Sequence, residues 1–248
     1  MAEPTVPDAR AERESLPSHI QGELRRLDRR IEKGDPLWPA QLAVGLAIAL
    51  NLTLSAKLVL GPKWLIPMVE GLLLVTLIVM APQRASDLHG HPRRRQLRGL
   101  LFTILGLVTL TYLVSLGLLV HYLVTGGQVG GRPLIGSGVV LWVTNVLLFS
   151  VIYWELDRGG PLRRFEPSRT WPDFQFPQME NPQFTPKGKE WQPTFLDYLY
   201  TSVTNATAFS PTDTMPLTQV AKVVMGIQGT AAIVTVGLVV ARAVNILG

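Results

Sequence analysis

The stretch "FLDYLYTSVTNATAFSPTDTMPLTQVAKVVMG", residues Phe195–Gly226, decides how the rest of the sequence is interpreted. It begins with the pattern of a short amphipathic helix, passes through small hydroxylated residues and a proline, and then becomes an apolar run. A break between two helices beside a membrane segment has the form of a pore loop, in which irregular backbone at membrane depth is sheltered by protein.

Hydropathy in the rest of the chain indicates an integral membrane protein. Hydrophobic residues make up 47% of the 248 residues, and charged residues only 17%. A bilayer core of about 30 Å needs about 20 apolar residues in a helix. Three runs carry no charge when His121 is taken as neutral, and two weaker runs carry Lys57 and Glu70. The predicted spans are Gly99–Val124, Leu134–Trp154, Val223–Ala241, Pro39–Leu60 and Trp64–Ala81.

The predicted fold is an all-α polytopic membrane helix bundle of about five transmembrane helices, with a short pore-helix-like re-entrant segment before the last. Residues 157–193 are rich in proline and aromatic residues, which excludes a long helix. Four regions follow: a cytoplasmic polar tail with a basic amphipathic helix (1–38), a four-helix membrane region (39–156), a strap that packs against the helices or lies at the headgroups (157–193), and the pore-loop-like segment with the last helix (194–248).

The polar N-terminal region contains the pattern of a basic amphipathic helix. In "SHIQGELRRLDRRIEK", Ser18 stands as an N-cap with Gln21 three residues later, a capping-box spacing. Two interpretations stay open. The helix lies on anionic lipid, or it is a plain juxtamembrane helix that obeys the positive-inside rule.

The distribution of arginine predicts the orientation. Basic residues are frequent before the first predicted span, after the second and after the fourth, whereas the loop "TGGQVGGRP" carries only Arg132. Because positive residues gather on the cytoplasmic side, we expect a multi-pass protein of the cell membrane with a cytoplasmic N-terminus. The loop at 194–217 then enters from the cytoplasmic side, unless one of the two weaker runs does not cross the membrane.

The segment "TFLDYLYTSVTNATAFSPTDTMPLT" resembles the pore helix and selectivity filter of the two-transmembrane potassium-channel superfamily. Ser202–Asp213 has the length of that family's S-V-x-T-x-T-T-V-G-Y-G-D without gaps, and Asp213–Pro216 reproduces the D-x-x-P that follows it. The resemblance implies an inner helix over residues 223–247 with a hinge at Gly226 or Gly229. It implies a pore lining of Thr204, Asn205, Thr207, Ala208, Phe209, Ser210, Pro211, Thr212 and Asp213.

The filter glycines of that family are absent. Ala208-Phe209-Ser210-Pro211-Thr212 stands where the family has T-V-G-Y-G. A potassium filter aligns carbonyl oxygens that replace the hydration shell of the ion, and its glycines permit backbone angles that other residues resist. Potassium selectivity is therefore not expected.

The layout also resembles the uncharacterised DUF1345-like bacterial membrane proteins. The residues that carry this resemblance are Tyr198-Leu199-Tyr200 and the pair Thr212-Asp213. It implies four spans, a linker and a terminal pore-loop-like block, and it implies no activity.

Polar residues inside the predicted spans are candidates for function, because ionisable groups at membrane depth are costly. Glu70 is either a cation or proton site, a partner of Lys57 or Lys63, or a carboxyl that stays protonated. Other amides are expected to form hydrogen bonds between helices, and these are Asn51, Asn145 and Gln228.

Several classes of function lack their motifs. The chain has no cysteine, no Walker loop, no G-x-S-x-G and no H-E-x-x-H, so catalysis and a cofactor are not expected. His89, His91 and Asp87 are too few for a metal site, and the net charge of +5 lies beside the spans rather than in a nucleic-acid surface. Two hypotheses remain: a cation channel in the lipid bilayer, tetrameric if it conducts, or a non-conducting structural or regulatory membrane protein.

Overall fold

The structure is a computed structural model, and it confirms a mostly helical protein. It describes residues 36–80, 94–125, 131–161, 171–181, 191–207 and 213–247. The N-terminal polar region, including Ser18 and Gln21, lies outside the described residues.

Three described helices are long and apolar enough to cross a membrane. They are α5 (Arg94–Thr125), α6 (Gly131–Leu156) and α9 (Gln219–Leu247). They coincide with the three uncharged runs of the sequence, and they support the prediction of a membrane protein. The last helix begins at Gln219, four residues before the predicted inner helix.

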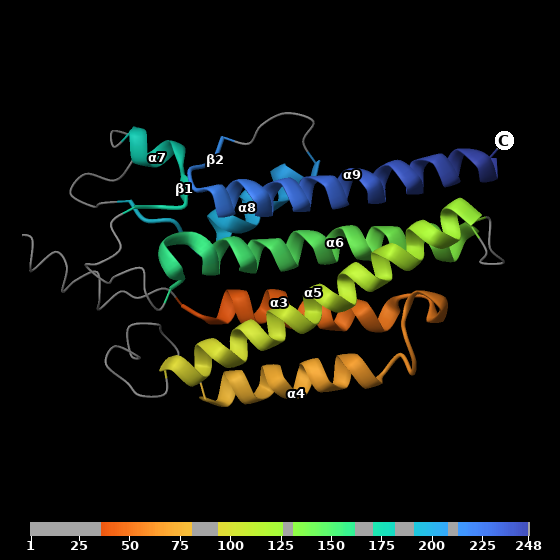
Figure 1. Cartoon of the computed structure of the whole chain (residues 1–248), viewed down its shortest axis with the longest axis horizontal. Coiled ribbons are helices and arrows are strands. Elements are labelled where there is room, and N and C mark those ends of the chain that lie inside the picture. The colour runs from red at the N-terminus through yellow and green to blue at the C-terminus, as the bar shows by residue number, and fades with distance from the viewer. Residues whose placement is uncertain are drawn as a thin grey trace, which may run out of the picture.

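Two shorter apolar helices, α3 (Trp38–Thr53) and α4 (Leu65–Met80), have 16 residues each. At 1.5 Å per residue each extends about 24 Å, less than the bilayer core of about 30 Å. Figure 1 shows that both run lengthwise through the bundle and that α3, α4, α5, α6 and α9 alternate in direction. The number of five spans stays a prediction.

The expected helical run over Pro39–Leu60 is wrong in its second part. α3 ends at Thr53, because Leu54 is extended (φ −61°, ψ 151°). A short 3₁₀ turn, Ala56–Leu58, follows, and the Lys63 ammonium donates to the Leu54 carbonyl oxygen that the broken helix leaves free. The loop between α3 and α4 is thus longer than the apolar run suggests.

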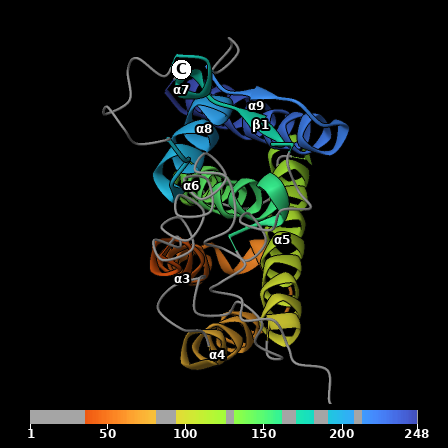
Figure 2. The same cartoon turned by 90° about the vertical axis from the view of Figure 1, so that its left-hand side faces the viewer.

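Helix α6 lies in the middle of the molecule. Figures 1 and 2 show α3 and α4 on one side of it, α8 and α9 on the other, and α5 crossing obliquely. Of the most apolar stretch of each helix, 56% is buried in α6, 39% in α5 and 17% in α9. The core is therefore built on α6, and α9 has the most exposed surface of the three.

The described part of the strap joins the segment that leads into α9. β1 (Phe174–Gln175) pairs antiparallel with β2 (Met215–Pro216), and Phe174 lies opposite Pro216. A single helical turn, α7 (Pro177–Glu180), follows β1. Phe174 and Phe176 are buried against Tyr198, with ring centroids 6.3 and 5.4 Å away. The strap thus packs on the helices through its aromatic residues.

Gly138 permits the close approach of α6 and α9, which leads to a first prediction. A methyl group at Gly138 would overlap Val239 Cγ2, whereas one at Gly136 would meet nothing within 4 Å. Gly138→Ala should lower the free energy of unfolding by about 1–3 kcal/mol through overpacking. Gly136→Ala is the control and should be neutral or stabilising. Thermal unfolding in detergent measures both, and equal melting temperatures would contradict this helix contact.

Candidate functional site

The candidate site is built on α8 (Phe195–Thr207), a short amphipathic helix with a reciprocal cap at its start. The Thr194 N–H and hydroxyl both donate to Asp197 Oδ2, at 2.7 and 2.8 Å. The Asp197 N–H donates to the Thr194 carbonyl oxygen at 3.0 Å. This arrangement satisfies donors that the first turn would leave free. One face of the helix is buried, namely Tyr198, Thr201, Ser202 and Ala206.

Helix α8 starts at one end of the bundle and ends about halfway along it. Near its start, the Tyr198 hydroxyl donates to Asp157 Oδ2 at 2.6 Å, just beyond the C-terminal end of α6. Near its end, the Trp142 indole N–H donates to the Ala206 carbonyl oxygen at 3.4 Å, close to the middle of α6. Thirteen helical residues extend about 20 Å, so α8 reaches about half the length of the long helices.

The first described residues after α8, Asp213–Pro216, lie at the end of the bundle where α8 began. The Thr201 hydroxyl donates to Thr214 Oγ1 at 3.1 Å, which places Thr214 beside the first half of α8. β2 follows directly and pairs with the strap. Figure 1 shows α8 and β2 at the same end of the bundle, where α9 also begins. α8 and the residues Asp213–Pro216 therefore lie against the same end of the bundle, and together they are called the α8 hairpin.

A buried hydrogen-bond network holds this hairpin in place. The Gln228 amide of α9 donates to the Ser202 carbonyl oxygen at 3.1 Å and to Ser202 Oγ at 2.7 Å. Ser202 Oγ donates in turn to the Val146 carbonyl oxygen of α6 at 2.7 Å. The Asn205 amide donates to Gln228 Oε1 at 2.8 Å and to Tyr153 Oη at 3.2 Å, and the Tyr153 hydroxyl also donates to Gln228 Oε1. Three helices are thus joined through polar side chains, and the predicted role of Gln228 is confirmed.

Two buried carboxyl groups join the strap to the hairpin. Asp157 Oδ1 accepts from the Asp173 N–H at 2.8 Å, while its Oδ2 accepts from Tyr198. Asp173 accepts from the Arg158 N–H at 2.9 Å and from the Thr218 hydroxyl at 2.9 Å. Thr218 caps α9 by accepting from the Ala221 N–H at 3.3 Å. The ends of α6, α8 and α9 therefore share one cluster of hydrogen bonds.

The turn that carries Asp157 requires left-handed backbone. Arg158, Gly159 and Gly160 have φ of 54°, 79° and 85°. Glycine adopts such angles at no steric cost, which explains the Gly-Gly pair that follows Asp157 and Arg158 after the end of α6. A methyl group at Gly160 would also lie 2.5 Å from Glu155 Oε2.

The predicted pore-lining residues differ in where they lie and in what they bind. Ala208, Phe209, Ser210, Pro211 and Thr212 lie outside the described residues. Thr204 and Thr207 donate their hydroxyls to carbonyl oxygens of α8 itself. Asn205 binds α6 and α9 as described above, and Asp213 is exposed. Their role in a pore stays a prediction.

The remaining candidates lie in α9 and α4. α9 is one continuous helix, in which Gly226 is exposed and Gly229 lies against Asn205, so the hinge also stays a prediction. Glu70 is fully buried. Its carboxyl forms no ion pair with a described residue, and Lys63 binds the Leu54 carbonyl instead.

Other polar residues in the spans bear on the remaining predictions. The predicted interhelical bond of Asn145 is confirmed, because its amide donates to the Tyr112 hydroxyl at 2.8 Å. The described residues contain no group of three or more His, Cys, Asp or Glu that could hold a metal ion. His89, His91 and Asp87 lie outside that part of the chain.

Sequence reasoning missed Tyr153, Asp157 and Asp173. The available signals were a tyrosine and an acidic residue at the end of an apolar run and a Gly-Gly pair that begins two residues after Asp157. Asp173 had no such signal, because its partners come from distant parts of the chain.

Comparison of this chain with protein-family models, with curated proteins and with solved structures finds no match. The family resemblances stated above therefore stay predictions.

The Tyr198–Asp157 bond leads to a second prediction. Tyr198→Phe leaves Asp157 Oδ2 buried without its hydroxyl donor, which should cost about 1–3 kcal/mol of unfolding free energy. Tyr200→Phe removes a hydroxyl from an exposed position two residues along the same helix and should cost much less. Thermal unfolding in detergent compares the two variants. A larger loss in Tyr200→Phe would show that the bond to Asp157 does not anchor α8.

Proposed function

We propose that this chain is a subunit of an oligomeric cation-conducting membrane protein, in which the α8 hairpin lines the ion pathway. The observation that carries the proposal is the position of α8. It enters between α6 and α9 from one end of the bundle, and its Ala206 carbonyl oxygen lies level with Trp142 near the middle of α6.

A helix that ends at this depth favours cations. The last carbonyl groups of a helix lack intrahelical donors and carry partial negative charge. Half-helices that end near the bilayer midplane use such C-terminal ends to bind cations in transporters. The Thr204 and Thr207 hydroxyls lie on the last two turns of α8 and add oxygen atoms there.

Selectivity for potassium is not part of the proposal. The segment after α8 contains Ser210, Pro211 and Thr212 in place of the glycines of a potassium filter. Proline fixes φ near −65°, which does not suit a continuous ladder of carbonyl oxygens. A pathway lined by hydroxyls and Asp213 would discriminate among cations by charge more than by size.

Exposed surface on α8 and α9 supports an oligomer, with a tetramer as the expected form. Leu196, Tyr200 and Thr207 are exposed on α8. On α9, Val220, Val223 and Ile227 are exposed. A pathway along this surface needs further copies of the chain, since a single copy leaves it open on one side.

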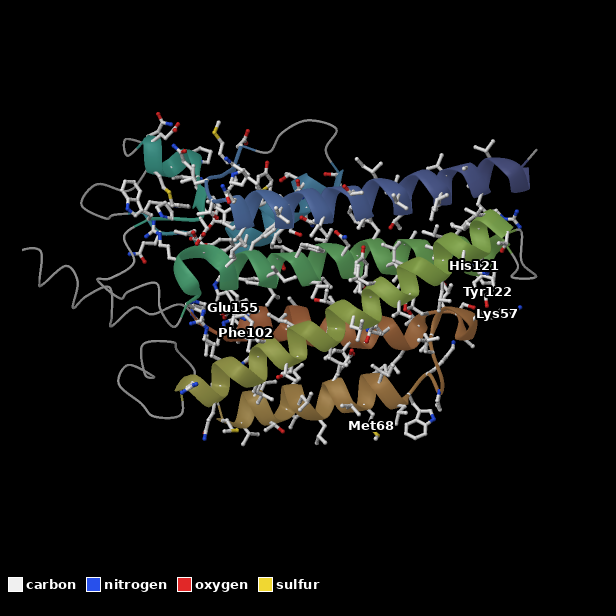
Figure 3. All side chains as sticks on the ribbon, viewed as in Figure 1. Lys57, Met68, Phe102, His121, Tyr122 and Glu155 are labelled. Carbon is white, nitrogen blue, oxygen red and sulfur yellow. The ribbon has the colours of Figure 1, made fainter. Side chains whose placement is uncertain are left out.

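The direction of the hairpin is also part of the proposal. α8 starts at the end of the bundle where α5 begins with Arg95 and Arg98 and where α6 ends near Arg158. Figure 3 shows Phe102 and Glu155 at this end, and Lys57, His121 and Tyr122 at the opposite end. By the positive-inside rule the arginine-rich end is cytoplasmic. The hairpin would then enter from the cytoplasm, as in ionotropic glutamate receptors and opposite to potassium channels.

One observation favours the alternative of a non-conducting membrane protein. The polar groups of Ser202 and Asn205 are engaged within the chain, and the Thr204 and Thr207 hydroxyls bind the backbone of their own helix. Such bonds would also satisfy a re-entrant helix that has only a structural or regulatory role.

The proposed interface can be tested by cross-linking, because the chain has no native cysteine. Thr207→Cys places the only thiol on the exposed end of α8, and we expect a thiol cross-linker to join subunits in nanodiscs. Leu72→Cys places it on the exposed surface of α4 and should stay uncrosslinked. Native mass spectrometry should give a tetramer. A monomer in both measurements would contradict the oligomeric pathway.

Conduction is tested by cation flux into liposomes and by planar-bilayer recording. Asp213→Asn should lower the cation conductance about two- to fivefold at low salt and less at high salt, because a charge at a pore mouth attracts cations and salt screens it. Glu180→Gln removes an exposed carboxyl on α7 and serves as the control. If an intact tetramer passes no cations, the non-conducting alternative holds.

A further inference from the structure

A second polar site lies in the other half of the bundle, around Glu70 of α4. Its exposed fraction is 0%. Met68, two residues earlier, projects from the outer edge of the bundle in Figure 3 and is exposed. The Glu70 carboxyl thus lies on the inner face of α4, against α3 and α5. The hairpin of α8 lies on the far side of α6.

The hydrogen bonds around Thr111 indicate where a proton resides. Thr111 Oγ1 is 3.0 Å from Glu70 Oε1 and also 3.0 Å from the Leu107 carbonyl oxygen. A threonine hydroxyl has one hydrogen and can accept as well. If Glu70 were an ionised carboxylate, its Oε1 atom and the Leu107 carbonyl oxygen would both have to accept the one hydrogen of the Thr111 hydroxyl. With a protonated Glu70, the carboxyl O–H donates to Thr111, and Thr111 donates to Leu107, so both short distances are satisfied.

The rest of the site has unpaired polar atoms. Glu70 Oε2, both polar atoms of the Asn51 side chain and Ser115 Oγ are buried without a hydrogen-bond partner among the described residues. Asn51 lies next to the Glu70 carboxyl. Ser115 is one helical turn after Thr111 on the same face of α5. The Thr111 and Asn51 side chains thus place polar atoms beside a carboxyl group that is otherwise enclosed by apolar helices.

No cation from the packed elements compensates a charge on Glu70. The described residues of α3 carry no charged side chain, and Glu70 is the only one on α4. On α5, Arg98 and His121 lie about 20 Å and 15 Å along the helix from Thr111, and Arg94 and Arg95 lie further away still. The Tyr112 hydroxyl binds Asn145 of α6, Tyr122 lies beside His121, and Lys63 binds Leu54. Lys57 lies in the loop after α3, and neither carboxyl oxygen of Glu70 has a cationic hydrogen-bond partner among the described residues.

We propose that Glu70, with Thr111 and Asn51, is a proton-binding site inside the membrane region. An unpaired carboxylate in such surroundings costs several kcal/mol, and a bound proton removes this cost while completing the hydrogen bonds of Thr111. The amide of Asn51, beside the carboxyl, offers a second acceptor and donor to Glu70 when the proton exchanges. This proposal is independent of whether α8 lines a pore.

The first test is reaction of the full chain in liposomes with dicyclohexylcarbodiimide, which modifies protonated carboxyl groups in apolar surroundings. Peptide mass spectrometry is expected to find the adduct on Glu70 and to find it lost in Glu70→Gln. Sodium or potassium ions should leave the labelling unchanged. Protection by either ion would overturn the proposal in favour of a cation site, and absence of labelling in the folded protein would overturn it as well.

The second test is infrared difference spectroscopy between the native chain and Glu70→Gln. Loss of a carbonyl band of a protonated carboxylic acid is expected, whereas loss of a carboxylate band would overturn the proposal. Thr111→Val should shift the acid band, because it removes the hydroxyl that binds Glu70. Thr109→Val is the matched control, since the Thr109 hydroxyl donates to the Leu105 carbonyl of its own helix. An equal shift in both threonine variants would contradict the assigned contact.

Discussion

The need to satisfy polar groups inside an apolar bundle is the constraint on which this structure depends. A helix that stops halfway through the bundle exposes carbonyl groups where no water is available, and each unsatisfied group is costly. The chain meets this constraint in the last turn of α8 with the Trp142 indole N–H, which donates to the Ala206 carbonyl oxygen. One turn earlier, Gln228 of α9 binds both the carbonyl oxygen and the hydroxyl of Ser202. Asn205 and Tyr153 complete the same network from α8 and α6. These bonds add to the apolar cluster of Val146, Ala206 and Ala232, through which α8 packs against both long helices.

The cluster around Asp157 extends this constraint to the end of the bundle. One carboxyl group accepts bonds from the strap and from α8, and Asp173 of the strap accepts from the cap of α9. The donors in these bonds are neutral backbone N–H and hydroxyl groups. Neutral hydrogen bonds to the two carboxyl groups therefore hold these segments together, and none of these bonds is an ion pair. The strap, α8 and α9 are therefore connected at one end of the bundle.

The two polar regions of the molecule differ in what they leave unsatisfied. Around α8 the described side chains are mostly paired, which suits a rigid support for the segment that follows. Around Glu70 several buried atoms have no partner, which suits a site that exchanges a ligand as small as a proton. α6 separates the two regions and supplies the apolar packing between them.

The sequence by itself determined the helical class, the three long apolar helices and the break before α9, because composition and the spacing of charges act locally along the chain. It also identified Glu70, Asn145 and Gln228 as residues that need partners, since a polar side chain in an apolar run is visible without a structure. It did not predict the end of α3 at Thr53, because apolar residues continue through Leu54–Leu60 on both sides of Lys57. The partners were decided by the tertiary structure alone: Asp157 meets Tyr198 and Asp173, and Glu70 meets Thr111, only where distant segments pack together. Hydrogen bonding between such segments depends on their relative position in space, and no local pattern of residues encodes that position.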